Sequence, residues 1–85
     1  MVGSTIRAAI VEDQHEIREG LATLTNRTSG YRCTGSFRTM EEALEGIKLE
    51  VPDIALCDLG LPGMSGIEGI RILKDRYPEL QLLVL

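Results

Sequence analysis

Three acidic residues end short apolar runs, and this spacing can build a site for a cation or a phosphoryl group. Asp58 ends the run that begins at Ile54, and Glu12 and Asp13 follow the run that begins at Ile6. If the two runs are neighbouring parallel strands, the carboxylates meet at the edge where open α/β sheets bind their ligands. Their mutual repulsion favours a bound divalent cation, and oxygen ligands alone suit Mg²⁺ or Mn²⁺. A simple turn aspartate is the alternative interpretation of Asp58, and the second acidic cluster disfavours it.

The elements that must position these acids are two short strands and the loop after the second. Segment 54–58 is too short for a helix and follows Pro52, so it is predicted to be a buried strand. The glycine-rich and proline-containing segment 60–66 then forms a loop. Ser65 and Glu68 have the spacing of a capping box, which places the start of a helix directly after that loop.

Hydrophobic periodicity predicts the remaining elements. We expect helices over about 15–27, 40–51 and 66–77, and strands over 6–11, 31–37 and 80–85. The resulting βαβαβαβ order predicts an α/β fold with a parallel, flavodoxin-like sheet of strand order 2-1-3-4. This order makes the strands that carry Glu12, Asp13 and Asp58 direct neighbours.

The helical spacing also predicts which side chains face the core. In the first helix Arg18 is expected to face outward with Glu16 and Glu19. The residues expected to face inward are Ile17, Leu21 and Leu24 in the first helix, Met40, Ala43, Leu44, Ile47 and Val51 in the second, and Ile67, Ile70, Leu73 and Tyr77 in the third.

Composition limits the class of protein. The chain has 85 residues, enough for one domain, and a net charge of −4 without a basic run, which argues against a nucleic-acid surface within it. No apolar segment is long enough to span a bilayer and no signal peptide is visible, so a cytoplasmic location is expected. Met1–Ser4 carry no pattern and are expected to be a disordered start or an expression remnant.

The two cysteines, Cys33 and Cys57, fall on strands that the expected sheet order separates by a third strand. At the usual strand spacing they would lie about 9–10 Å apart, too far for a disulfide. We expect two buried free thiols rather than a redox pair. His15 is a candidate phosphoacceptor or metal ligand, but it has no partner histidine or cysteine, and a solvated position in the first helical turn is favoured.

Two motifs together resemble a known family. Segments Ala9–Asp13 and Leu56–Gly66 are similar to the receiver domain of bacterial two-component response regulators. The segment around Asp58 is most similar to the subfamily that carries a LuxR-type helix-turn-helix output domain, the LuxR/NarL type. The resemblance runs from about Thr5 to Leu85, which is almost the whole chain.

The resemblance implies a role for each site residue. Asp58 would be the phosphoacceptor, phosphorylated by a partner histidine kinase within a phosphorelay that regulates transcription. Asp13 and Asp58 would bind Mg²⁺ directly, Glu12 directly or through water, and the backbone carbonyl of Gly60 would supply a further oxygen. Pro62 and Gly66 are expected to shape the loop, which is a structural role.

The chain departs from the family at its C-terminal end. Intact receivers continue beyond the fourth strand, and their site hydroxyl and phosphate-binding lysine lie in that continuation. Lys48 and Lys74 are on expected helices and cannot replace the lysine. We therefore expect a partial receiver domain over residues 1–85 that can bind Mg²⁺ but is impaired in phosphotransfer and is not an enzyme. DNA would be contacted only through an output domain that these residues do not include. The fourth strand would be an exposed apolar edge beside an uncovered sheet face, and self-association through either is expected.

Two other functions remain open. The chain could be a folding or engineered fragment that self-associates and carries out no phosphotransfer. It could also be a phosphohydrolase with an aspartate nucleophile, although that class usually has a second aspartate two positions after the first, where this chain has Gly60. An adduct on Asp58, its absence, or turnover of a phosphate ester would distinguish the three.

Overall fold

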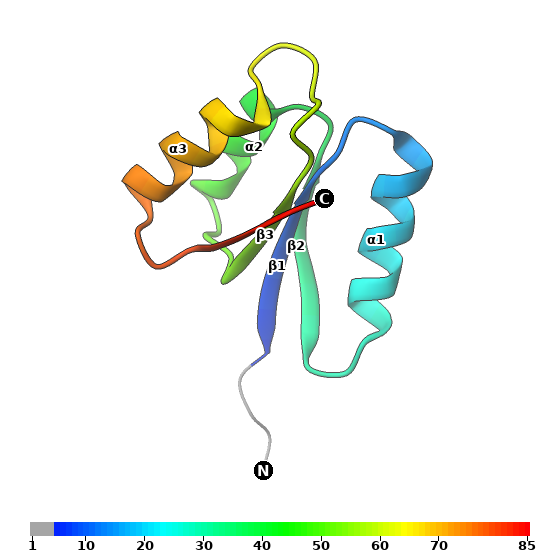
Figure 1. Cartoon of the computed structure of the whole chain (residues 1–85). Coiled ribbons are helices and arrows are strands. Elements are labelled where there is room, and N and C mark those ends of the chain that lie inside the picture. The colour runs from blue at the N-terminus through cyan, green and yellow to red at the C-terminus, as the bar shows by residue number, and fades with distance from the viewer. Residues whose placement is uncertain (1–4) are drawn as a thin grey trace.

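The computed structural model describes residues 5–85, and Met1–Ser4, for which a disordered start or a remnant was predicted, lie outside them. Strands and helices alternate along the chain (Figure 1). Their bounds are β1 Ile6–Val11, α1 His15–Arg27, β2 Tyr31–Phe37, α2 Met40–Ile47, β3 Ile54–Cys57, α3 Gly66–Arg76 and β4 Gln81–Val84.

The four strands form one parallel sheet in the order β2-β1-β3-β4. This confirms the predicted flavodoxin-like α/β fold and makes β1 and β3 direct neighbours, with Val11 opposite Cys57. The register of β1 against β2 shifts by one residue between Ala8 and Ala9, so Thr34 has no partner in the ladder. Its hydroxyl instead donates to the carbonyl oxygen of Ala8 at 3.5 Å.

Helices cover the two faces of the sheet unequally. Figure 1 shows α2 and α3 side by side on one face and α1 alone on the other. The main core lies between the sheet and the α2–α3 pair, where apolar side chains are removed from water. Its buried members are Ala9, Val11, Met40, Ala43, Leu44, Ile47, Ala55, Cys57, Leu61, Leu73 and Leu80.

The predicted inner face of α1 is partly wrong. Arg18 is buried, with 7% of its surface exposed, whereas Leu24 is 64% exposed and Ile17 is also exposed. The physical reason is that α1 covers only the β1–β2 half of its face of the sheet. Leu24 therefore borders an open hollow of about 270 Å³, whose far wall includes Ile54 and Leu56 of β3.

The inner face of α3 agrees with the prediction at Ile70, Leu73 and Tyr77, which are buried or pack against the core, but not at its first residue. Ile67 is exposed, and the helix buries Gly66 and Gly69 as well as Leu73. The glycines face inward because the helix lies so close to its neighbours that a Cβ atom at Gly69 would overlap the buried side chain of Met40. Glycine permits this close approach, which hydrophobic periodicity alone does not reveal.

Helix α2 is shorter than predicted. It ends at Ile47 rather than near Val51, and Leu49 in the following turn is almost fully exposed. Val51 still packs against the core, but from the loop before β3. The predicted N-cap of α3 is present, since the Ser65 hydroxyl accepts from the amide of Glu68 at 3.2 Å. The Thr39 hydroxyl caps α2 in the same way, accepting from the amide of Glu42 at 3.1 Å.

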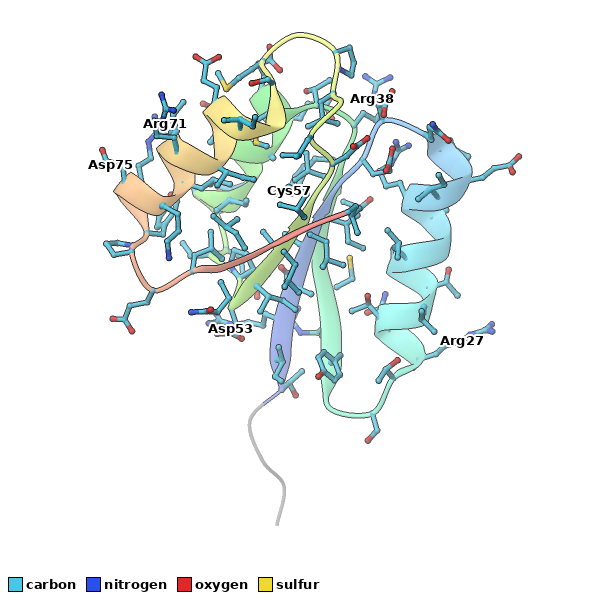
Figure 2. All side chains as sticks on the ribbon, viewed as in Figure 1. Arg27, Arg38, Asp53, Cys57, Arg71 and Asp75 are labelled. Carbon is cyan, nitrogen blue, oxygen red and sulfur yellow. The ribbon has the colours of Figure 1, made fainter. Side chains whose placement is uncertain are left out.

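The two cysteines are free and lie on strands separated by β1, as predicted. Cys57, labelled on β3 in Figure 2, is fully buried among the core residues. Cys33 is only half-buried, so the expectation of two buried thiols holds for Cys57 alone. Separately, none of the helices within residues 5–85 has the length and apolar character needed to cross a bilayer.

Candidate metal centre

The loops after β1 and β3 bring together the three carboxylates that the sequence singles out. Glu12, Asp13 and Asp58 each offer one oxygen atom, and these atoms all lie within 4.8 Å of one another. The backbone sets this arrangement, because the amide of Asp58 donates to the carbonyl oxygen of Val11 at 3.0 Å and so extends the β1–β3 pairing. In Figure 1 the two loops meet at the end of the sheet opposite the N-terminus.

Glu12 is the buried member of the cluster, with 4% of its surface exposed. Its amide donates to the carbonyl oxygen of Phe37 at 3.0 Å, which ties the loop to β2. Its carboxylate accepts from the amide of Gln14 at 3.0 Å, at the start of α1. Asp13 is exposed and Asp58 half-buried, so the three acids form a site that is closed on one side and open to solvent on the other.

Burial raises the pKa of the Glu12 carboxyl group, and the neighbouring Asp13 and Asp58 raise it further. The hydrogen bond from the Gln14 amide acts in the opposite direction but does not cancel these effects. A carboxylate that is both desolvated and surrounded by like charge is stabilised by a nearby cation. The donor set of hard oxygen atoms therefore fits Mg²⁺ or Mn²⁺, with Asp13 and Asp58 accessible to the ion.

The Asp58 side chain is fixed by the residue two positions later. The amide of Gly60 donates to Oδ1 of Asp58 at 3.0 Å, which leaves Oδ2 free of that bond. Gly60 is exposed, and its carbonyl oxygen, predicted as a metal ligand, remains a prediction. Two further contacts hold the loop: Leu61 is buried in the core, and the amide of Met64 donates to the Glu41 carboxylate at 3.2 Å.

The start of α3 packs directly against the backbone that carries Asp58. A Cβ atom at Gly66 would overlap the carbonyl oxygen of Asp58, and it would lie 2.7 Å from the Cα atom of Leu59. Only glycine fits there without displacing backbone atoms. Pro62 is exposed in the same loop. Gly66 thus shapes the loop, as predicted, and the structural role of Pro62 remains a prediction.

Two residues at the site were not identified from the sequence. Arg18 was predicted to face solvent, but its guanidinium group donates to the carbonyl oxygen of Glu12 at 2.9 Å. Glu41 is absent from the predicted inner face of its helix, and it holds the loop after Asp58 by accepting from the amide of Met64 at 3.2 Å. The Glu41 contact joins residues 23 positions apart and depends on the tertiary arrangement, so no local pattern marks it. The Arg18 contacts are local, but the polar character of arginine at that position predicts a solvent-facing side chain rather than one that folds back over the helix start.

The remaining candidates lie away from the acids or contribute no ligand to the cluster. Lys48 pairs with Glu45, and Lys74 donates to the carbonyl oxygens of Pro78 and Leu80 at 2.9 and 3.0 Å. His15 is exposed, as favoured, with its Nδ1 atom 3.2 Å from Nη2 of Arg18. The described residues thus place no lysine beside Asp58.

A parallel sheet of this order, with clustered carboxylates after its first and third strands, defines a receiver-type α/β domain. The chain belongs to the response regulator receiver domain family, whose model matches residues 8–85. The motifs around Asp13 and Asp58 thus indicated the family correctly.

Individual relatives agree with this assignment. The chain is 34% identical over 80 residues to the transcriptional regulatory protein LnrK of Bacillus subtilis, covering 94% of this chain and 36% of that protein. It is 31% identical over 80 residues to the DNA-binding transcriptional activator DevR/DosR of Mycobacterium tuberculosis, covering 94% of this chain and 37% of that protein. The chain thus spans about a third of the length of these curated relatives.

Solved structures give the same fold and subfamily. A LuxR-family two-component response regulator from Aurantimonas sp. superposes with a TM-score of 0.87 at 33% identity, covering 95% of this chain and 58% of that one. The receiver domain of the response regulator NarL from Mycobacterium tuberculosis superposes with a TM-score of 0.87 at 26% identity, covering 96% and 66%. These two structural neighbours are of the LuxR/NarL type.

Proposed function

We propose that the chain is a magnesium-dependent phosphoacceptor in which Asp58 receives a phosphoryl group from the phosphohistidine of a partner kinase. The observation that carries the proposal is the convergence of the Glu12, Asp13 and Asp58 oxygens within 4.8 Å, at the end of a receiver sheet. Asp13, Asp58 and the carbonyl of Gly60 would hold the ion, with Glu12 as a direct or water-mediated ligand. Mn²⁺ is an alternative ion.

The chemistry is one transfer to a carboxylate. An oxygen of Asp58 attacks phosphorus, the bond from phosphorus to the donor breaks, and the donor leaves with the bonding electrons and a proton. The Gly60 amide, 3.0 Å from Oδ1, orients the nucleophile. When bound, the ion neutralises charge on the transferring oxygens. The product is an acyl phosphate on Asp58, so the chain accepts one group and turns over no substrate.

Transfer to this 85-residue polypeptide should be slow. A fixed cation beside the transferring group stabilises the charge of the transition state. Lys48 and Lys74 are both bonded elsewhere, and the buried Arg18 donates to backbone carbonyls. The proposal includes a cytoplasmic location and control of transcription through a DNA-binding domain outside these residues, by analogy with the transcriptional regulators among the relatives.

Acetyl phosphate with Mg²⁺ tests the proposal by intact mass and peptide mapping. We expect a phosphoryl adduct on Asp58 whose yield depends on Mg²⁺, and no adduct in Asp58→Asn. Asp75→Asn removes the same charge from an exposed position on α3 and should retain the adduct. Absence of any adduct, with beryllofluoride also failing to bind, would overturn the proposal. Turnover of a phosphate ester would instead indicate a phosphohydrolase.

We also infer that this polypeptide self-associates. The alternative that it is a fragment without phosphotransfer activity predicts the same association. β4 is an edge strand of the described sheet, and Leu83, Val84 and Leu85 are each about half exposed. Leu83 pairs in register with Leu56, which lines the hollow beside Leu24. An apolar edge continuous with an uncovered apolar face favours pairing between copies, by strand addition, face packing or swapping.

A further inference from the structure

We propose that Arg18 is a positioning residue that holds the Glu12–Asp13 loop in the shape that selects a small divalent cation. The inference rests on the metal site of the proposed function and goes beyond it, because it assigns ion selectivity to a residue that contributes no ligand. The observation behind it is that the buried guanidinium group of Arg18 contacts the backbone carbonyl oxygens of Glu12 and Asp13, two of the proposed metal ligands.

The clamp consists of contacts to backbone oxygens. Nη1 of Arg18 donates to the carbonyl oxygen of Glu12 at 2.9 Å and lies 3.4 Å from that of Asp13. Nη2 contacts Nδ1 of His15 at 3.2 Å, which keeps the planar group in one orientation. Because these partners precede Arg18 by three to six positions, the side chain folds back over the start of its own helix.

The loop needs such a clamp because its helix start is otherwise weakly held. The N-cap residue Gln14 makes no side-chain hydrogen bond to the first turn of α1. The Glu12 end is held by its amide on Phe37 and by its carboxylate on Gln14. Asp13 is exposed, and its carbonyl oxygen lies 3.4 Å from Nη1 of Arg18. The amide of Gln14 in the same peptide unit donates to the Glu12 carboxylate at 3.0 Å, so the two contacts fix this peptide plane together.

The charge of Arg18 is used differently from that of the three arginines that form ion pairs. Arg7, Arg32 and Arg38 each pair with a carboxylate, and all three are far more accessible to solvent than Arg18. Within residues 5–85, Arg18 is 7% exposed and has no carboxylate within ion-pair distance. Burying a cation among neutral partners is costly, and an apolar residue would fill this space without that cost. The bidentate geometry of the guanidinium is therefore the property that the site uses.

Loop rigidity bears directly on ion choice. Mg²⁺ requires near-octahedral ligands at short distances, whereas Ca²⁺ accepts longer and more variable ones. If the clamp is released, Asp13 can still reach an ion, but its carboxylate is no longer restricted to the geometry that Mg²⁺ requires. Loss of Arg18 should therefore weaken Mg²⁺ binding more than Ca²⁺ binding.

Mg²⁺ and Ca²⁺ titrations followed by the backbone amide signals of residues 12–14 test the inference. In Arg18→Met we expect Mg²⁺ affinity to fall about tenfold or more, as for other residues that orient metal ligands. Ca²⁺ affinity should fall less, so the ratio of the two affinities decreases. Arg18→Lys keeps the charge without the planar group and should show a smaller decrease. Arg32→Met removes an exposed arginine and should leave the ratio unchanged.

The outcomes separate this inference from the proposed function. A wild-type chain that binds neither ion would overturn the metal site itself. Binding by the wild type with an unchanged affinity ratio in Arg18→Met would overturn only the role of Arg18. If circular dichroism shows that Arg18→Met does not fold, the affinity ratio of Arg18→Lys tests the role of Arg18 instead, and an unchanged ratio would overturn it. Loss of the fold in both variants would also overturn the inference, because Arg18 would then be required for folding rather than for ion selection.

Discussion

The amide nitrogen of Asp58 donates a hydrogen bond to the carbonyl oxygen of Val11, at 3.0 Å. This bond continues the β1–β3 ladder by one residue beyond Cys57, and it places Asp58 beside the residue that follows Val11, Glu12. A shift of one residue in this register would move Asp58 to the other face of the sheet. The acidic cluster is therefore a direct product of strand pairing.

The first prediction concerns the pH dependence of stability at Glu12. Burial, helped by Asp13 and Asp58, raises the pKa of this carboxyl group in the folded chain. A raised folded pKa adds stability below the unfolded pKa, and this contribution is lost as the pH rises through the folded pKa. Without divalent cation, Glu12→Gln should therefore be more stable than the wild type at neutral pH in urea denaturation, and this advantage should shrink in acid.

Two controls accompany the Glu12 experiment. Glu79→Gln removes a charge from an exposed loop and should show no comparable gain. Saturating Mg²⁺ should reduce or reverse the advantage of Glu12→Gln, since a ligand that binds the folded state stabilises the chain that binds it better. If Glu12→Gln is less stable than the wild type at neutral pH without cation, the ionised Glu12 carboxylate does not destabilise the folded chain, and the prediction is wrong.

The second prediction uses two glycines in helices. Gly66→Ala places a Cβ atom against the backbone of Asp58 and should destabilise the fold by about 1–3 kcal/mol. Gly20→Ala in α1 meets no atom within 4 Å and should stabilise it by about 0.5–1 kcal/mol. Equilibrium denaturation measures both. Equal effects of the same sign would show that the start of α3 is not packed against Asp58 as described.

The third prediction concerns thiol reactivity. Burial raises the pKa of the Cys57 thiol to about 11, and the thiolate is the reactive form. Iodoacetamide at pH 8 should therefore modify the half-buried Cys33 well before Cys57, as followed by peptide mass mapping. In denaturant both should react at similar rates. Faster modification of Cys57 in the folded chain would mean that the core beneath β3 is open to solvent.

The fourth prediction concerns association through β4. Light scattering should give a mass at least twice the 9.3 kDa of one chain. Leu83→Asp places a charge on the exposed apolar edge and should reduce this mass toward that of one chain. Leu49→Asp introduces the same change on a residue that is 90% exposed before β3 and should not. A stable wild-type monomer would refute self-association.

The sheet and the acidic cluster were predictable because they depend on signals that lie close together in the sequence. The run from Ile54 is bounded by Pro52 and a glycine-rich loop, and the run from Ile6 ends at Glu12. Alternation with helical segments then leaves few ways to order the strands. The positions of these acids in the structure follow from the order of the strands, without reference to any side-chain packing.

The features that were not predicted depend on how elements meet in space. The apolar stripe of α1 pointed to Leu24 and away from Arg18, because periodicity assumes that a helix is covered along its whole inner face. α1 covers half of a sheet face, which leaves Leu24 exposed. The guanidinium group of Arg18 instead lies against the loop after β1. Likewise, two glycines rather than Ile67 face inward in α3, where the backbone approaches Asp58 and Met40.

The burial of Leu61 has a mechanical consequence for the segment that follows Asp58. Because Leu61 is buried in the core, the segment has two short parts, residues 58–60 and 62–65, which we call its first and second arms. The first arm carries Gly60 beside the acceptor carboxylate, and the second carries Met64, tied to Glu41. We therefore expect a displacement of the first arm by an incoming group to stop at Leu61. We expect movement to reach the second arm only when the Leu61 side chain leaves the core, so this one residue would control how far a change at Asp58 spreads along the chain.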